Sequence, residues 1–258
     1  MKNKKLYITI LILLIISGIS IYVYKWEFRD KLFEIYFFSL NRGRSIFIRT
    51  PENKTILIGG GQNTEVIREI TKVTPFYKRR IDKIVIPSAN VNQIGGLIEI
   101  IERYKIEEVL IPKIISTSTV LSELKKIVKR NKIHVTEVVE GDSLEIEDGL
   151  SIKVIFPNDN FKYNKTSLSE LGLRINYIDS SVYLIGNLSK TIQKYIAKNI
   201  VDTARTGGTR NSMVEFYNSA IESKVSKELL DKIKPQFIFS TKERTTHFIS
   251  DGNNWIKK

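Results

Sequence analysis

The chain has 258 residues, of which 42% are hydrophobic and 27% are charged, as expected for a globular protein with a hydrophobic core. It contains no cysteine, which excludes disulfides, thiolate metal sites and cysteine nucleophiles, and its two histidines exclude a zinc site with three imidazoles from one chain. The net charge of +13 fits either a polyanionic partner or a lysine-rich composition without an electrostatic role, because the basic residues are spread along the chain.

The N-terminus combines a basic tail with an uncharged apolar run. Three lysines lie within residues 1–5, and residues 6–24 contain no charged side chain. As a helix at about 1.5 Å per residue, this run would be about 28 Å long, close to the hydrocarbon thickness of a bilayer. The run continues apolar past its small residues, which argues against a cleaved signal peptide. The sequence therefore predicts a transmembrane signal anchor in the cell membrane, single-pass, with the soluble domain on the extracytoplasmic side.

The rest of the chain alternates predicted strands and helices. Segment 25–43 is aromatic and amphipathic and could be a linker or a first strand; we assign it as a juxtamembrane linker. Strands are expected over 44–50, 54–60, 81–87, 106–112, 133–139, 142–149, 150–157, 171–187 (two strands), 234–241 and 245–257 (a pair), with a further one beginning near 200. The three strands over 133–157 are expected to form one β meander. Helices are expected over 63–76, 93–105, 116–131, 189–199 and 213–224. Residues 44–258 therefore read as one domain, with two packed sheets and helices outside them.

One loop stands where α/β proteins usually carry their chemistry. The predicted strand 81–87 ends in a polar loop, and Gly95-Gly96 then opens an apolar helix. The polar side chains of this loop are Ser88, Asn90, Asn92 and Gln93. None of them ionises near neutral pH, so the loop has the frame of an active site without its acids and bases.

These stretches, taken in order, resemble the metallo-β-lactamase fold, in the branch of the C-terminal domain of ComEC-type competence proteins. "SIFIRTPENKTILIGGG" is similar to the opening hairpin, and "RRIDKIVIPSANVNQIGGLIEIIERYKIEEVLIP" to the strand, metal loop and helix. "NKTSLSELGLRINYIDSSVYLIGNLS" is similar to the later segment that ends in Gly-Asp. The resemblance covers about residues 44–258. It implies an α/β fold, a four-layer αββα metallo-β-lactamase-like sandwich, here preceded by the expected transmembrane helix.

The resemblance also locates the metal-binding positions of the family, where this chain has no histidine or carboxylate. They fall on Gly59, Ser88, Asn90, Asn92, Gln93, Asn187 and Thr206. Asn and Gln offer only neutral oxygens, whereas this fold holds metal through imidazoles and carboxylates. Without metal there is no activated hydroxide at neutral pH. The resemblance therefore implies a pseudoenzyme with no catalytic residue, no metal and no cofactor, in which the amides keep the shape of the loop.

A replacement pocket is a separate possibility. Asp179, Asp202 and Asp251 are candidate carboxylates. A possible anion-binding or polar pocket comprises Asp202, Arg205, Gly207, Gly208, Thr209 and Arg210. A Gly-rich loop with two arginines could hold a phosphate, although a plain turn between a strand and a helix is the simpler interpretation. His134 and His247 occupy ordinary strand positions, which favours structural roles for both.

Three functions remain open from the sequence. The first is binding or scaffolding by a membrane-anchored inactive domain, with nucleic acid at the cell envelope as the partner that the ComEC resemblance suggests. The second is a metal-dependent hydrolase, phosphodiesterase- or nuclease-like, with a displaced metal site. The third is a structural envelope protein that docks on a membrane protein. The first is the favoured hypothesis, and it predicts weak, salt-dependent binding of DNA.

Overall fold

The computed structural model describes residues 2–27, 32–75, 77–113, 117–157, 170–199, 211–216, 225–240 and 245–258. The chain divides into two compact units, Met1–Leu32 and Phe33–Lys258.

The first unit is a single helix, α1 (Lys2–Glu27), of 26 residues. Within the described part of the chain, no helix combines the length and the apolar character that a membrane crossing requires. The helix expected at residues 6–24 is therefore present, but its expected role as a transmembrane anchor is not supported.

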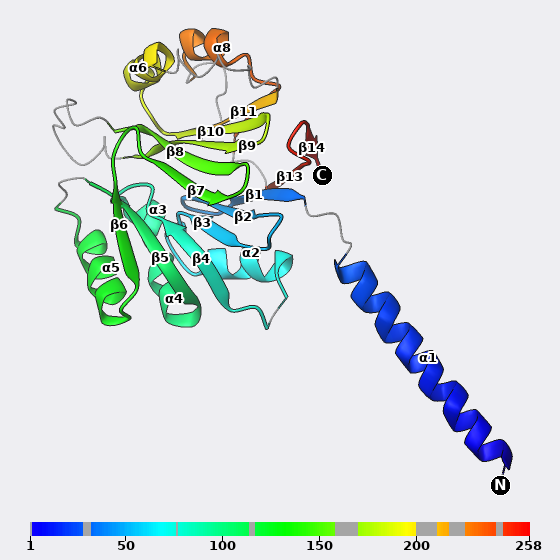
Figure 1. The fold of residues 1–258 in the computed structure, drawn as a ribbon. Coiled ribbons are helices and arrows are strands. Elements are labelled where there is room, and N and C mark those ends of the chain that lie inside the picture. Colours follow the sequence, from blue (N-terminus) through cyan, green and yellow to red (C-terminus); the bar gives the residue numbers. More distant parts are fainter. Residues whose placement is uncertain are drawn as a thin grey trace. The chain divides into compact units, whose positions relative to one another are not determined.

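The second unit is built on two β-sheets (Figure 1). The larger sheet contains β1 (Phe33–Ser39), β2 (Arg44–Arg49), β3 (Thr55–Ile58), β4 (Arg80–Val85), β5 (Lys105–Pro112), β6 (His134–Val138), β13 (Thr246–Ser250) and β14 (Trp255–Lys257), in the order β14-β13-β1-β2-β3-β4-β5-β6. The smaller sheet contains β7 (Ser143–Glu147), β8 (Leu150–Phe156), β9 (Gly172–Tyr177), β10 (Ser180–Gly186), β11 (Asn211–Phe216) and β12 (Phe237–Ser240), in the order β12-β11-β10-β9-β8-β7.

Helices cover the outer faces of both sheets. They are α2 (Glu65–Val73), α3 (Val91–Ile94), α4 (Leu97–Arg103), α5 (Thr119–Arg130), α6 (Lys190–Asn199) and α8 (Lys227–Ile233). In Figure 1, α2, α4 and α5 lie against the larger sheet, and α6 and α8 lie on the far side of the smaller one. The described residues of this unit thus form the expected αββα arrangement of four layers.

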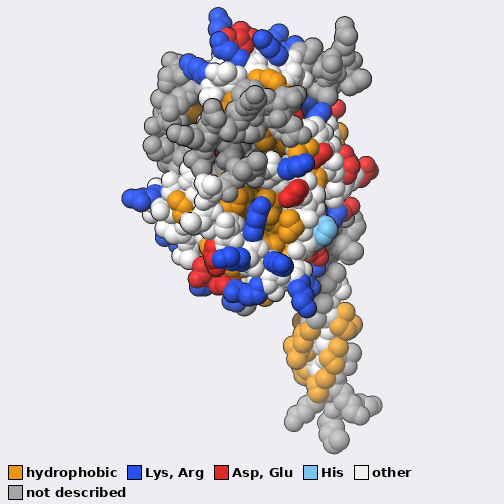
Figure 2. Space-filling view, turned by 90° about the vertical axis from the view of Figure 1, so that its left-hand side faces the viewer, with side chains coloured by type: hydrophobic (Ala, Val, Ile, Leu, Met, Phe, Trp, Pro, Cys, Tyr) orange, Lys and Arg blue, Asp and Glu red, His pale blue; other side chains and the backbone are white. Residues whose placement is uncertain are grey.

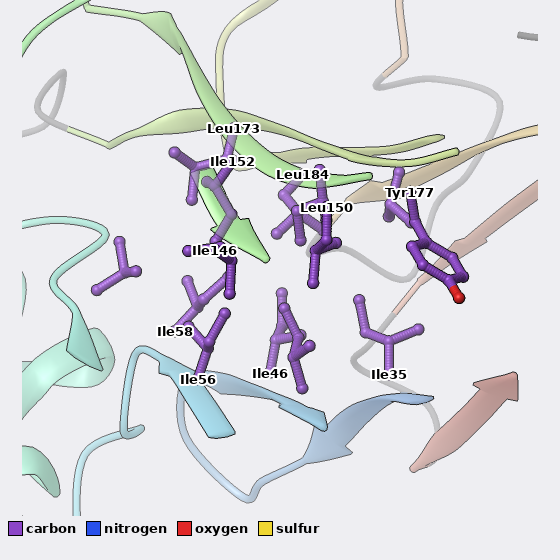
Figure 3. Packing of buried hydrophobic residues seen from close by; sticks show 14 of the residues in the cluster. Ile35, Ile46, Ile56, Ile58, Ile146, Leu150, Ile152, Leu173, Tyr177 and Leu184 are labelled. Carbon is purple, nitrogen blue, oxygen red and sulfur yellow. The ribbon is translucent and has the colours of Figure 1, made fainter. Parts of the chain in front are cut away.

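Three apolar clusters hold these layers together. The cluster between the sheets joins β1–β3 to β7–β10, and Figure 3 shows its side chains meeting from the two sides. Its labelled members are Ile35, Ile46, Ile56, Ile58, Ile146, Leu150, Ile152, Leu173, Tyr177 and Leu184. A second cluster packs α2, α4 and α5 on the larger sheet, and a third packs α6 and α8 on the smaller sheet. Both faces of each sheet are therefore covered, and central strands such as β3 and β10 are buried along their whole length.

The structure corrects three expectations about individual strands. The segment assigned to a linker, 25–43, contains β1, which pairs with β2 and β13 inside the larger sheet. The segment 133–139 does not join a meander with its successors, because β6 pairs in parallel with β5 in the larger sheet while β7 and β8 form a hairpin in the smaller one. The expected helix 213–224 overlaps β11, which is buried between β10 and β12.

Candidate functional site

Four segments that are far apart in the sequence meet at one end of the sheets. Arg44 begins β2, Gly59 follows β3, Pro87 lies in the loop after β4, and Asn187 follows β10. A Cβ on Gly59 would lie 3.2 Å from the Arg44 carbonyl oxygen and 3.3 Å from the Pro87 ring. Glu170 connects the Asn187 segment to β2, because its carboxylate accepts hydrogen bonds from the Arg44 guanidinium and from the backbone amide of Asn187. Three of the positions that the family resemblance assigns to metal binding, Gly59, Gln93 and Asn187, therefore lie in segments that meet here.

The polar loop uses its side chains to hold its own backbone. The Ser88 hydroxyl accepts a hydrogen bond from the Asn90 amide at 3.2 Å. The Asn90 side-chain oxygen accepts one from the Asn92 amide at 2.9 Å and so caps α3. These are the backbone contacts typical of Ser and Asn at helix N-caps and turns. Ser88 and Asn90, two positions that the family resemblance assigns to metal binding, thus have a structural role in shaping the loop.

Gln93 is buried, as Ser88 is. Only 4% of its surface is exposed, its amide donates to the Asn90 carbonyl, and its carbonyl accepts from the Gly60 amide at 2.7 Å. Its side-chain oxygen Oε1 is buried and has no hydrogen-bond partner among the residues that the structure describes. An amide oxygen is neutral and is a weaker transition-metal ligand than an imidazole or a carboxylate.

The Gly95-Gly96 pair packs against the loop that follows β3. A Cβ on Gly95 would overlap the Gln62 carbonyl oxygen, and a Cβ on Gly96 would overlap the carbonyl oxygens of Gly60 and Asn63. The Gly96 amide donates to the Gly61 carbonyl at 3.1 Å. These glycines are therefore required by the close approach of two backbones, which is independent of any metal.

A buried arginine with two carboxylates lies at the centre of the site. Arg44 Nη2 is 2.6 Å from Glu170 Oε1, and Arg44 Nη1 is 2.5 Å from Glu215 Oε2. The exposed fractions of the three side chains are 3%, 10% and 0%. Glu170 precedes β9 and Glu215 lies on β11, so the triad of Arg44, Glu170 and Glu215 ties the larger sheet to the smaller one. A Cβ on Gly186 would overlap both Arg44 and Glu170, so a residue without a side chain is needed here.

The electrostatics of the triad follow from its burial. Burial disfavours the charged guanidinium, but the carboxylates of Glu215 and Glu170 more than offset this and raise the pKa of Arg44 above its ordinary value. Burial also raises the pKa of Glu170, although Arg44 and the Asn187 amide act to lower it. The arginine is therefore charged at every physiological pH, and it is the cation that the two carboxylates surround.

Four of the remaining candidates, His134, His247, Asp179 and Asp251, lie in the described part of the chain. In the ranges that the structure describes, no group of three or more His, Asp or Glu side chains is placed to hold a metal ion. His134 lies on the edge strand β6 and His247 on β13. Asp179 precedes β10 and its amide donates to the Gly252 carbonyl, next to Asp251. Both aspartates therefore lie at the end of β10 opposite to the triad.

Part of the predicted site falls outside the described residues. This applies to Thr206 among the former metal positions, and to the whole possible anion pocket. The pocket residues concerned are Asp202, Arg205, Gly207, Gly208, Thr209 and Arg210. The anion pocket stays a prediction.

Sequence reasoning missed all three members of the triad. Glu215 was placed on an expected helix, Glu170 lay just before an expected strand, and Arg44 was treated as the first residue of a strand. One signal was available: Glu215 stands in the run "SMVEF" between Val214 and Phe216, both of which are buried. A carboxylate in an apolar strand needs a buried cation, and this requirement points to an arginine elsewhere in the chain.

Comparison with known proteins relates the chain to others by structure only. No protein-family model matches the chain, and no curated protein matches its sequence. A mutant of the β-hydroxylase CmlA, a diiron enzyme from Streptomyces venezuelae, superposes with a TM-score of 0.52 at 17% identity, over 81% of this chain and 45% of CmlA. The chain thus spans less than half of that protein.

Two further solved structures have lower scores. The metallo-β-lactamase-fold protein YhfI from Bacillus subtilis gives a TM-score of 0.47 at 9% identity, over 81% of this chain and 97% of YhfI. Zn²⁺-bound PqqB from Methylobacterium extorquens gives 0.45 at 12% identity, over 67% of this chain and 59% of PqqB. Identities this low speak to fold alone. The superposition on CmlA, taken with the two stacked sheets, supports the α/β sandwich described above.

Proposed function

We propose that this protein is a catalytically inactive, metal-free relative of the metallo-β-lactamase-fold hydrolases and that it acts by binding or scaffolding. The observation that carries the proposal is the buried triad. Arg44 lies among the segments of Gly59, Pro87 and Asn187, where the family resemblance places metal ligands. In this proposal, the positive charge of the Arg44 guanidinium takes the place of the positive charge that the metal ion supplies in the family.

The charge balance around Arg44 supports this proposal. Both carboxylates of the triad are bonded to the guanidinium, so a metal ion that used them as ligands would have to displace Arg44. A divalent ion beside Arg44 would also lie close to its fixed positive charge, which offsets part of the attraction of the carboxylates. The neighbouring loop adds only neutral side-chain oxygens, those of Ser88, Asn90, Asn92 and Gln93. These donors do not fit the zinc, manganese or iron centres of hydrolases.

Metal content tests the proposal directly. The full chain, purified without chelators, is expected to carry far less than one equivalent of zinc, manganese or iron by plasma mass spectrometry. Adding Zn²⁺ or Mn²⁺ is expected to leave Tm unchanged, because an ion that binds no native site cannot stabilise the folded state. One tightly bound equivalent with a rise in Tm would contradict the proposal and favour the metal-dependent hydrolase, since that function requires a resident ion.

The partner and the location are separate proposals. Nucleic acid at the cell envelope comes from the ComEC resemblance, and the net charge of +13 is compatible with it. Residence in the cell membrane, with the domain on its outer side, also stays a prediction, as does docking on a membrane protein. Binding of labelled DNA that is weak and falls with rising salt would support the first, provided that a lysine-rich control protein of equal charge binds less well.

A further inference from the structure

A groove lies between α5 and the edge strand β6, far along the sheet from the triad. Its volume is about 640 Å³. It is lined by Ile111, Lys125, Val128, Lys129, Lys132, Ile133, His134, Val135 and Glu137. Figure 2 views the face of the molecule that carries α5 and β6, and it shows apolar surface bordered by basic side chains. The groove therefore combines an apolar floor with a charged rim.

The rim carries unpaired positive charge. The three lysines of the groove, Lys125, Lys129 and Lys132, make no ion pair with any described residue. Lys126 and Arg130 of the same helix, in contrast, each pair with a glutamate. The one acidic side chain in the groove lies on β6, so the net charge of the lining is positive. This charge is complementary to an acidic ligand.

The strand beside the groove has an unpaired edge. β6 is the last strand of the larger sheet and pairs in parallel with β5 on one side only, among the described strands. Val135 on this strand is 41% exposed. An edge strand offers a row of backbone donors and acceptors at the spacing of another strand, and apolar side chains can pack beside it.

We propose that this groove binds an extended acidic segment of a partner protein, which adds to β6 as a further strand. Its backbone would pair with β6, its apolar side chains would pack over Val135 and Ile133, and its carboxylates would face the lysines. The edge strand and the apolar floor favour a polypeptide over a nucleic acid, because phosphates use neither. The proposal concerns a different face from the triad and does not depend on whether that site is free of metal.

Fluorescence anisotropy with a labelled peptide of alternating valine and glutamate tests this proposal on the full chain. The test variant is Lys125→Gln/Lys129→Gln/Lys132→Gln. The control variant, Lys126→Gln/Lys190→Gln/Lys227→Gln, removes the same charge from exposed positions outside the groove. The wild type is expected to bind, the test variant to bind at least about tenfold more weakly, and the control variant to bind within about twofold of wild type. Unchanged Tm values would show that both variants fold.

Two further probes identify the mode of binding. The same peptide with every second amide N-methylated is expected not to bind, because it cannot pair with β6. Undiminished binding of this methylated peptide, or equal weakening by both lysine variants, would overturn the proposal. The affinity of a single-stranded oligonucleotide is expected to be the same for the test variant as for the wild type. If it binds through the three lysines while the peptide does not, the groove is a nucleic-acid surface and the peptide proposal fails.

Discussion

Replacing Arg44 with methionine is expected to lower the free energy of unfolding by about 3–5 kcal/mol, because it leaves two buried carboxylates without their cation. Methionine keeps much of the volume of the arginine stem, so the loss reports on charge more than on packing. The measurement is urea unfolding of the full chain at pH 7. A triple variant, Arg44→Met/Glu170→Gln/Glu215→Gln, is expected to recover much of the loss, since it removes the charges together.

Arg80 provides a matched control for this experiment. It also pairs with two carboxylates, those of Asp82 and Glu107, but 49% of its side chain is exposed. Arg80→Met is expected to change the free energy of unfolding by no more than about 1 kcal/mol, because solvent screens exposed ion pairs. Equal losses of unfolding free energy for Arg44→Met and Arg80→Met would show that the buried triad stabilises the fold no more than an exposed ion pair does.

The loss caused by Arg44→Met is expected to depend on pH. Burial already raises the pKa of Glu170 in the wild type, and removing Arg44 takes away an interaction that lowers it. A carboxyl group whose folded pKa lies above its unfolded pKa binds protons more tightly in the folded state, so its contribution to stability falls as pH rises through the folded pKa. The stability gap between variant and wild type should therefore be largest at neutral pH and shrink as the pH is lowered towards the pKa of an unfolded glutamate.

Gly96→Ala is expected to destabilise the fold by about 1–3 kcal/mol through overpacking. The backbone of Gly96 has φ −70° and ψ −16°, which alanine adopts without strain. On conformational grounds alone, alanine would be neutral or stabilising. Its Cβ would nevertheless overlap the carbonyl oxygens of Gly60 and Asn63, and these belong to backbone that cannot rotate away. Urea unfolding measures the loss.

Gly141→Ala separates steric overlap from backbone strain. Gly141 has φ +96°, but a Cβ there would meet nothing within 4 Å. This variant is expected to lose about 1–2 kcal/mol from the left-handed conformation alone. A smaller loss for Gly96→Ala than for Gly141→Ala would show that the two glycine-rich loops can separate at little cost, which would contradict the close packing described for them.

The outcome for β11 shows where local pattern reading fails. Met213, Phe216 and the following apolar residues have helical spacing, which predicted a helix from 213. In the structure, Asn211–Phe216 is a parallel strand between β10 and β12 and is buried on both faces. A strand buried on both faces loses the alternation that identifies exposed strands, so only its neighbours distinguish it from a short helix. The expectation for β6 failed for a different reason: it was grouped with β7 and β8, which follow it in the chain, whereas it pairs with β5 on the other side of helix α5.

The sequence by itself determined the local frame of this protein. The strand pairs expected over 44–60, 171–187 and 245–257 correspond to β2 with β3, β9 with β10, and β13 with β14 in the structure. The sequence also determined the loop from Ser88 to Gly96, because caps and glycine turns act over a few residues. Only the tertiary structure decided that Arg44, Glu170 and Glu215 form one buried triad. Their pairing spans as many as 171 residues of sequence and depends on the stacking of two sheets, which no local pattern encodes.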